Sequence, residues 1–273
     1  MRPLPSADPV NLSMTVENIS FGYGDQPVLR QVNAEFPPGQ VTAVLGPNGS
    51  GKSTLMQILL GFLQPQAGVV RLGERLLTQV SERQRATQIA FVPQAPTVGF
   101  SYTVEEIILM GRWPRRGADG PLHAALGLTG ADDRAAATQA MWNLNVHHLA
   151  GRAFGELSGG EQQRVTIARA IALDAPILLL DEVTTSLDLW HQLEFLAYLA
   201  ELAHRRGRCV VWITHDLNQA NEYADRVVLM NDGQVVAQDA VKSVLVPDIL
   251  ETVYRVKVDP AGKALRFLRK SPA

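Results

Sequence analysis

The chain has 273 residues, of which 46% are hydrophobic, so it can form one large domain or two modest ones around an ample core. Its formal net charge of -2 provides no overall positive field that would attract nucleic acid or anionic lipid. The single cysteine, Cys209, excludes an internal disulfide framework and a cysteine-rich zinc site, and its apolar surroundings favour a small buried strand residue over a reactive thiol. No apolar run approaches the roughly 18 residues of a membrane helix. Residues 1–10 contain three prolines and no apolar signal region, so we expect no signal peptide and folding in the cytosol.

The chain is expected to begin with a loose leader over residues 1–11 and to continue with strands over 14–19 and 28–36. The turn between these strands contains Tyr23. An exposed tyrosine ring can stack on a flat base such as adenine, and it can equally be a turn aromatic without a ligand.

A glycine-rich stretch lies between an apolar run at 41–45 and residues with helical spacing at 55–62, which predicts strand, turn and helix. This context supports the phosphate-binding pattern G-x-x-x-x-G-K-[ST]. Its glycines allow backbone N–H groups to converge on phosphate oxygens, and the helix start adds its positive dipole end. Lys52 can reach the β- and γ-phosphates, and the Ser53 hydroxyl can bind Mg²⁺. The predicted phosphate loop is Gly46, Pro47, Asn48, Gly49, Ser50, Gly51, Lys52, Ser53 and Thr54.

After a short strand at 69–72, Ser81 and Gln84 form a capping-box pattern that predicts a brief helix. The buried strand predicted at 89–92 is followed by Gln94, at the end of the strand where ligands gather in open α/β sheets. Its amide could meet Mg²⁺ or the attacking water, or it could be a solvated loop residue.

The middle of the chain is predicted to be helical, because residues 100–157 show no strand pattern. A capping box at Thr103 and Glu106 opens a helix to Met110, and a second helix is expected over 134–149. Between them, residues 111–133 are rich in loop formers, and we expect a solvated face there for the arginines Arg112, Arg115 and Arg116. Residues of about 100–155 are therefore predicted to form a helical lobe inserted into an α/β core.

The stretch from Leu157 to Arg164 begins another helix, with Ser158 as the N-cap and Glu161 as its capping-box partner. Gly159 and Gly160 cost the first turn roughly 1 kcal/mol each relative to alanine. That cost is explained where a second anion must approach the backbone.

The buried strand predicted at 177–182 ends in two carboxylates, Asp181 and Glu182. Next to a phosphate loop, Asp181 is expected to hold Mg²⁺ through water and Glu182 to polarise the attacking water. A helix is expected from Leu187–Asp188 to about His204.

His215 follows the strand at 210–213 and could bond to the γ-phosphate. The histidines His123, His147, His148, His191 and His204 lack such a position. A hairpin is expected at Asn231-Asp232-Gly233. The tail is expected to form a helix near 249–254, strands around Val256 and Leu265, and a turn at 259–262.

In this order, these motifs resemble the ATP-binding-cassette (ABC) ATPases over about Leu12 to Arg269, and the most specific is Leu157-Ser158-Gly159-Gly160-Glu161-Gln162 ahead of the Asp181-Glu182 strand. The resemblance implies a P-loop NTPase (RecA-like) core with an antiparallel β subdomain and the inserted helical lobe. It implies an ABC domain over 12–255 and a short C-terminal extension over 256–273. Val183 replaces the proline common in the family, which makes the turn after Glu182 less rigid.

The resemblance also assigns roles. Tyr23 would stack on adenine, Gln94 would be the coupling glutamine and His215 the switch histidine. Ser158 to Gln162 would close on the ATP of a partner subunit, and Asp188 would lie in the loop that links both sites. ATP and Mg²⁺ are the implied cofactors, with Ser53, Gln94 and Asp181 at the metal. The implied assembly is a homodimer that forms on ATP binding and joins transmembrane permease subunits at the cytoplasmic face of the cell membrane. A substrate-binding protein is an indirect partner. No nucleic acid is expected as a partner.

Within the family, three segments resemble the iron-siderophore, haem and cobalamin importer ATPases: Gly111-Arg112-Trp113-Pro114, His191-Gln192, and His215 to Ala220. Arg115 replaces the histidine usual after that proline. The expected cargo is therefore a chelated metal. A zinc or manganese importer ATPase is the nearest alternative, followed by a soluble ABC ATPase and a degenerate cassette. The last would typically lack the glutamate or the histidine that stand here at 182 and 215.

Overall fold

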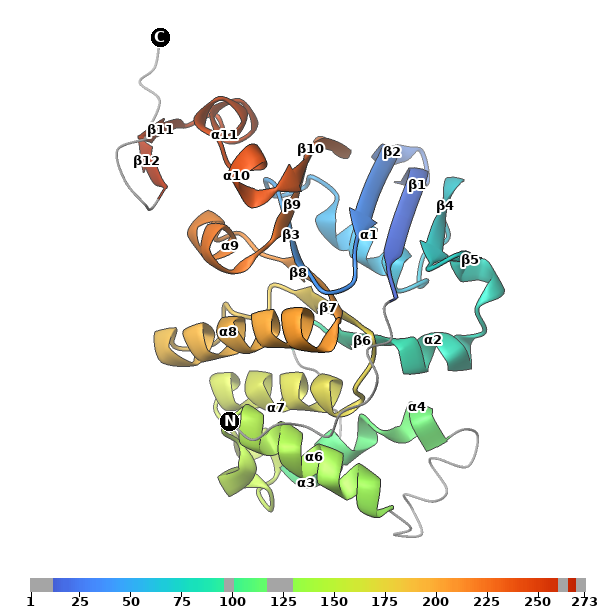
Figure 1. Ribbon diagram of the computed structural model, residues 1–273, viewed down its shortest axis with the longest axis vertical. Helices are drawn as coiled ribbons and strands as arrows, with labels where there is room; N and C mark the ends of the chain where they lie inside the picture. The colour runs from blue at the N-terminus through green and yellow to red at the C-terminus, as the bar shows by residue number, and fades with distance from the viewer. Residues whose placement is uncertain (1–11, 96–100, 117–129, 260–264, 269–273) are drawn as a thin grey trace. The chain divides into compact units, whose positions relative to one another are not determined.

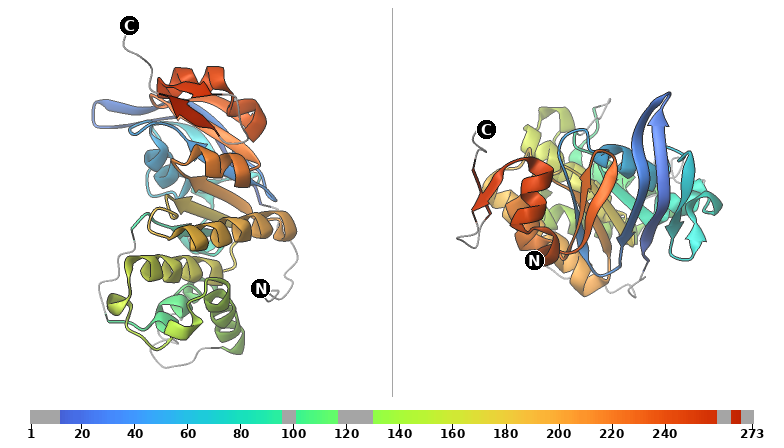
Figure 2. Two further views of the ribbon diagram at one scale, coloured as in Figure 1. Left: turned by 90° about the vertical axis from the view of Figure 1, so that its left-hand side faces the viewer. Right: turned by 90° about the horizontal axis from the view of Figure 1, so that it is seen from above.

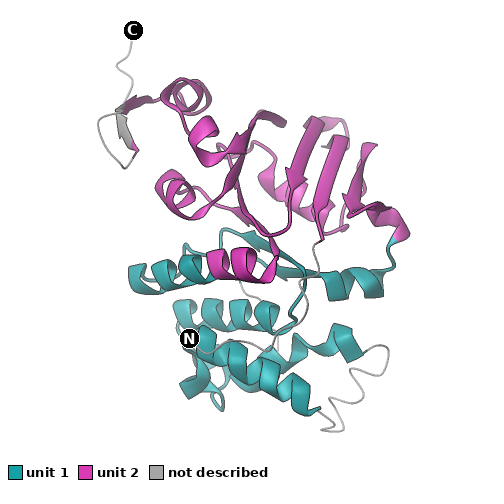
Figure 3. Cartoon of the chain, viewed as in Figure 1, with its two compact units in different colours: residues 1–10, 80–198 teal, residues 11–79, 199–273 magenta. Residues whose placement is uncertain are grey.

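The computed structural model describes residues 12–95, 101–116, 130–259 and 265–268 (Figure 1). The chain divides into two compact units (Figure 3): unit 1 takes in residues 1–10 and 80–198, and unit 2 takes in residues 11–79 and 199–273. The expected leader, His123 and residues 260–262 of the expected tail turn lie outside the described residues. The residues of the predicted helical lobe fall in unit 1, which also contains two strands, and the lobe stays a prediction.

Unit 2 contains an antiparallel sheet in the order β2-β1-β4-β5. Its strands are β1 (Met14–Tyr23), β2 (Gln26–Phe36), β4 (Ala67–Leu72) and β5 (Arg75–Leu76), and a 3₁₀ turn, Leu77–Gln79, follows. The side chains of Met14, Ile19 and Phe36 are fully buried, so the sheet has one face in the core.

The second set of strands in unit 2 centres on β3 (Val41–Leu45), which pairs in parallel with β8 (Cys209–Ile213) and β9 (Arg226–Asn231). β10 (Gln234–Ala240) runs antiparallel to β9, and the hairpin predicted at Asp232-Gly233 is confirmed, with φ of 48° and 79°. Every residue of β3 and β8 is buried, as expected for parallel strands covered on both faces.

The remaining elements of unit 2 are α1 (Lys52–Leu59), α9 (Leu217–Tyr223), α10 (Val241–Val244), α11 (Pro247–Tyr254) and a hairpin of β11 (Lys257–Asp259) with β12 (Arg266–Leu268). Cys209 is fully buried in β8, its thiol donates to the Phe36 carbonyl oxygen at 3.2 Å, and burial raises its pKa to about 12. The expectation of an inert buried thiol is therefore confirmed.

Unit 1 contains the parallel pair β6 (Ile89–Val92) and β7 (Ile177–Asp181) and a group of packed helices (Figure 2). The helices are α2 (Glu82–Gln88), α3 (Val104–Met110), α4 (Trp113–Arg116), α6 (Ala131–Asn143) and α7 (Gly159–Ala172), with 3₁₀ turns at His147–Leu149 and Phe154–Glu156. α8 (Leu189–Arg206) begins in unit 1 and ends in unit 2. Among the described residues, no helix is both long and apolar enough to cross a membrane.

The capping boxes predicted at Ser81, Thr103 and Ser158 are all present. The helix predicted over 134–149 was wrong in its end: α6 stops at Asn143, and Asn145 adopts a left-handed φ of 52° that a helix cannot continue. A separate 3₁₀ turn then covers His147–Leu149.

The prediction of a solvated face was wrong for Arg112 and Arg116, whereas Arg115 is exposed, as predicted. Arg112 and Arg116 are only 12% and 11% exposed at the side chain, and each places its Nε within 2.8 Å of a carboxylate oxygen of Asp133. Arg112 also donates to the Ala172 carbonyl oxygen at 2.9 Å, and Arg115 donates to those of Leu173 and Asp174 at 2.6 Å. These arginines satisfy the carbonyl groups that the end of α7 leaves without helical partners.

Candidate functional site

The phosphate loop in unit 2 takes the form that the sequence predicted, between buried β3 and α1. Gly46, Gly49 and Gly51 have φ of 148°, 78° and 98°, which L-residues rarely adopt. A Cβ on Gly46 would lie 2.2 Å from the Met230 carbonyl oxygen, and one on Gly51 would lie 2.6 Å from Leu29 Cδ2. Gly46 and Gly51 are therefore required by both conformation and space, and Gly49 by conformation alone.

Lys52 is held inside this loop. Its side chain is 5% exposed, and Nζ donates to the carbonyl oxygens of Gly46 at 2.8 Å and Pro47 at 2.9 Å. The Ser50 hydroxyl is buried and finds no hydrogen-bond partner among the described residues, whereas Ser53 is exposed. A buried ammonium, an unsatisfied hydroxyl and the start of α1 are a donor set that fits phosphate oxygens, and the exposed Ser53 hydroxyl fits a cation beside them.

Tyr23 and His215 are the other predicted site residues of unit 2. Tyr23 is 52% exposed, and the centroid of its ring lies 5.0 Å from that of Phe21 in an edge-on arrangement. Its hydroxyl donates to Gln57 Oε1 at 3.4 Å. His215 is exposed in the turn between β8 and α9, where Asp216 caps α9 by accepting from the N–H groups of Asn218 and Gln219. Both positions suit contact with a ligand, and the roles assigned to them stay predictions.

Unit 1 brings Gln94 and Glu182 together. Gln94 follows β6, Glu182 follows β7, and Gln94 Nε2 donates to Glu182 Oε2 at 2.8 Å. Glu182 has a left-handed φ of 49°, an uncommon backbone conformation for a residue other than glycine, and one that clusters at functional sites. Asp181 is the last residue of β7. The carboxylate predicted as the base is thus oriented by the Gln94 amide, a contact that was not predicted from the sequence.

The start of α7 is also in unit 1, and its first residues are open to solvent. Ser158 and Gly159 are exposed, and the Ser158 N–H and hydroxyl both donate to Glu161 Oε2 at 2.8 Å. These hydrogen bonds lower the pKa of Glu161. Gln162 turns back to its own loop, since Nε2 donates to the carbonyl oxygens of Phe154 and Leu157 at 3.2 Å. The contact shown for Gln162 is therefore structural, and its predicted ligand role stays a prediction.

The predicted metal ligands are Ser53, which lies in unit 2, and Gln94 and Asp181, which lie in unit 1. No group of three or more His, Cys, Asp or Glu that could hold a metal ion occurs among the residues that the structure describes. The oxygen ligands at hand are those that suit Mg²⁺ shared with a phosphate.

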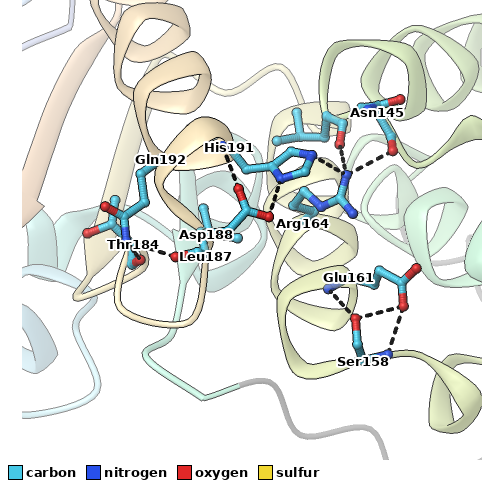
Figure 4. A network of polar contacts seen from close by, with 10 residues as sticks. Asn145, Ser158, Glu161, Arg164, Thr184, Leu187, Asp188, His191 and Gln192 are labelled. Atoms are coloured by element: carbon cyan, nitrogen blue, oxygen red, sulfur yellow. Dashed lines mark hydrogen bonds and ion pairs between the residues drawn. The ribbon is translucent and has the colours of Figure 1, made fainter.

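Sequence reasoning missed one polar network in unit 1 (Figure 4). His191 Nε2 lies 3.0 Å from Arg164 Nη1, and His191 Nδ1 lies 2.7 Å from Asp188 Oδ2. Gln192 Nε2 donates to the carbonyl oxygens of Thr184 and Leu187 at 2.9 and 2.8 Å. The sequence did single out the pair His191-Gln192 as a motif. The residues that bond to these two side chains could not be predicted from local sequence.

Comparison with known proteins decides the family. The sequence profile of the ABC transporter family matches residues 29–185, a stretch that contains the phosphate loop, the start of α7 and the Asp181-Glu182 pair. The chain belongs to the ABC transporter family. It is 44% identical to the hemin import ATP-binding protein HmuV of Gloeobacter violaceus, over 82% of this chain and 81% of that protein. It is 34% identical to the iron(3+)-hydroxamate import ATP-binding protein FhuC of Bacillus subtilis, over 90% of this chain and 89% of that protein.

Solved structures of ABC proteins agree. An inward-facing putative metal-chelate type ABC transporter is similar with a TM-score of 0.79 and 32% identity, over 96% of this chain and 99% of that chain. A bacterial ABC transporter cassette solved as a dimer gives a TM-score of 0.72 and 28% identity, over 84% of this chain and 98% of that chain. The P-loop NTPase fold expected from the sequence is therefore confirmed.

Proposed function

We propose that this ABC protein is the ATP-hydrolysing subunit of an importer for a chelated metal, a ferric siderophore or haem. The observation that carries the ATPase part is the hydrogen bond that orients Glu182 through Gln94. The cargo rests on relatives whose names specify hemin and iron-hydroxamate import. The segments Gly111 to Pro114, His191-Gln192 and His215 to Ala220 support the same subfamily.

In the proposed reaction, the phosphate loop binds the β- and γ-phosphates of ATP through its backbone N–H groups and Lys52. Bound Mg²⁺ would neutralise phosphate charge, with Ser53, Gln94 and, through water, Asp181 as its ligands on this chain. Glu182 accepts a proton from the water that attacks in line, and His215 donates to the γ-phosphate. Tyr23 stacks on the adenine ring.

The ATPase subunit works as a head-to-tail homodimer that forms on ATP binding. The exposed start of α7, with Ser158, Gly159 and Gly160, offers N–H groups to the γ-phosphate bound by the opposite subunit. Gel filtration with light scattering tests this: Glu182→Gln should be monomeric without nucleotide and dimeric with ATP. A dimer that forms equally without ATP would contradict the ATP-dependent homodimer. So would the absence of any dimer even within the assembled transporter.

The partners of the dimer are transmembrane permease subunits at the cytoplasmic face of the cell membrane, supplied by a substrate-binding protein. The predicted helical lobe of about 100–155 docks on the permease, and Gln94 links its movement to the γ-phosphate.

The function is tested by uptake in cells that lack the gene. Loss of radiolabelled ferric-siderophore or haem uptake is expected, with rescue by the wild-type gene and none by a Lys52→Ala copy. Unchanged uptake of every ferric chelate and of haem, with loss of zinc or manganese uptake instead, would reject the cargo and keep the ATPase. Unchanged uptake of all of them would reject the import function.

A further inference from the structure

His191 and Gln192 sit side by side in the first turn of α8 and both reach back over the loop that follows Glu182. Asp188 Oδ1 accepts from the His191 backbone N–H at 3.0 Å, and Asp188 Oδ2 pairs with His191 Nδ1 at 2.7 Å. These bonds lower the pKa of Asp188, although its side chain is 66% exposed. Gln192 holds the same loop independently through the carbonyl groups of Thr184 and Leu187.

Arg164 of α7 fixes the protonation of the His191 ring. Arg164 Nη1 lies 3.0 Å from His191 Nε2 and donates to the Asn145 carbonyl oxygen at 3.0 Å. A guanidinium has only donors, so Nε2 must accept and carry no proton. The ring proton therefore lies on Nδ1 and is donated to Asp188. This hydrogen-bonded chain runs in one direction, from Arg164 through neutral His191 to the Asp188 carboxylate (Figure 4).

Arg164 connects the hydrogen-bonded network around His191 to α7. Arg164 is only 9% exposed. Burial lowers its pKa, and this effect outweighs the nearby carboxylates of Glu161, Asp188 and Glu194, which raise it. The His191 imidazole lies between the Arg164 guanidinium and the Asp188 carboxylate and contacts both. Because Arg164 belongs to α7, which follows the N-cap Ser158, the hydrogen-bonded series from Arg164 to Asp188 joins α7 to α8.

A second contact joins the same two segments. A Cβ on Gly160, in the first turn of α7, would lie 3.1 Å from the Ser186 carbonyl oxygen, so α7 approaches the loop after Glu182 at its start as well. At the other end of that loop, the Thr185 hydroxyl donates to the Glu182 carbonyl oxygen at 3.0 Å. The loop is thus bonded to α8 at Asp188, lies close to α7 at Ser186 and is closed on itself by the bond from Thr185 to Glu182.

We propose that His191 is a positioning residue for ATP hydrolysis: its neutral ring, protonated on Nδ1, holds the helix that begins at Ser158 and the loop that follows Glu182 together as one unit. This inference rests on the proposed ATPase function. When the start of α7 moves, Glu182 moves with it. His191 touches no reacting atom and acts through the placement of the base.

Two substitutions separate its two bonds. In His191→Asn the side-chain amide can replace Nδ1 as the donor to Asp188, but Arg164 loses the imidazole acceptor and keeps only backbone carbonyl acceptors such as that of Asn145. In His191→Gln the amide oxygen can replace Nε2 as the acceptor for Arg164, but Asp188 loses its side-chain donor and keeps only the backbone N–H of residue 191. Both variants should lower the kcat for ATP hydrolysis in the assembled transporter by about 10- to 100-fold, the loss expected from a small misplacement of a catalytic group.

The KM for ATP and the melting temperature separate positioning from general damage. Both should stay close to wild type in the two variants, and Arg83→Gln, at an exposed arginine of α2 in unit 1, should keep the wild-type kcat. A wild-type kcat in both His191 variants would overturn the inference. So would a fall of kcat that comes only with a large loss of thermal stability or of ATP affinity.

A spectroscopic measurement tests the geometry without the reaction. Two-bond ¹H–¹⁵N NMR correlation of the full chain labelled at histidine should show His191 neutral, with Nδ1 protonated and Nε2 bare, and the signal should be assigned by its loss in His191→Asn. A ring protonated on Nε2 at neutral pH would overturn the inference. If the wild-type transporter hydrolyses no ATP, the proposed function fails, and this measurement still decides the hydrogen-bonded chain.

Discussion

Lys52 carries the positive charge of the phosphate loop inside the fold, with Nζ within 2.9 Å of two loop carbonyl oxygens. Lys52→Ala removes the charged partner of the phosphates and should weaken ATP binding by about 10- to 100-fold, the equivalent of a lost charge-assisted hydrogen bond. Equilibrium titration with ATP measures this. Lys242→Ala, an exposed lysine of α10, is the control and should bind as wild type. Wild-type affinity in Lys52→Ala would contradict the site assignment.

At the scale of single residues, sequence reasoning succeeded where the partner is close in the chain. Ser158 and Glu161 are three residues apart, so their capping box could be predicted and is present. Arg164 and His191 are 27 residues apart, and Arg112 and Asp133 are 21 apart. Their partners depend on how helices pack, which a local pattern does not encode. For that reason Arg112 and Arg116 were wrongly expected on a solvated face, and the Arg164–His191 contact was missed.

At the scale of elements, the packing of α3 against α7 depends on Gly111. A Cβ there would lie 2.1 Å from the Arg169 carbonyl oxygen, which is backbone and cannot move aside cheaply. Gly111→Ala should therefore lower the free energy of unfolding by about 1–3 kcal/mol, the range for an overpacked core. Gly155→Ala, where a Cβ would meet nothing within 4 Å, is the matched control. Urea denaturation compares them, and equal stability of the two variants would contradict the packing argument.

The link between α6 and α4 depends on pH through Asp133. Burial alone would raise its pKa, but hydrogen bonds from Arg112 and Arg116 lower it overall. Because the pKa is lower in the folded than in the unfolded chain, this stabilisation is present above the unfolded value and is lost as the pH falls through the folded one. Acid should therefore weaken the link.

Asp133→Asn leaves both guanidinium groups without their carboxylate and should destabilise the chain by about 1–3 kcal/mol at neutral pH. The difference from wild type should shrink as the pH falls from about 6 to about 3. Urea denaturation at a series of pH values measures this, with the exposed neighbour Asp132→Asn as the control. A difference that stays constant over this range would show that the charge of Asp133 is not what holds the two helices.

At the scale of the whole molecule, the sequence was sufficient for the family and the order of its motifs. The phosphate loop, the start of α7 and the Asp181-Glu182 pair each follow from short stretches that are bounded by buried strands or capped helices. The division into two units was not visible, because α8 runs through it without interruption. Tyr23, the phosphate loop and His215 lie in unit 2, and Gln94, Ser158 and Glu182 lie in unit 1.

The central claim is that this ABC protein hydrolyses ATP with Glu182 as the base. Glu182→Gln keeps the shape of the side chain and an oxygen that can accept from Gln94, but it removes the basicity. In the assembled transporter its ATPase rate should fall by at least about 100-fold, while ATP still binds within about threefold of wild type, since the phosphate loop is unchanged. Glu156→Gln, an exposed glutamate of unit 1, should keep the wild-type rate. A Glu182→Gln transporter that hydrolyses ATP near the wild-type rate would contradict the account.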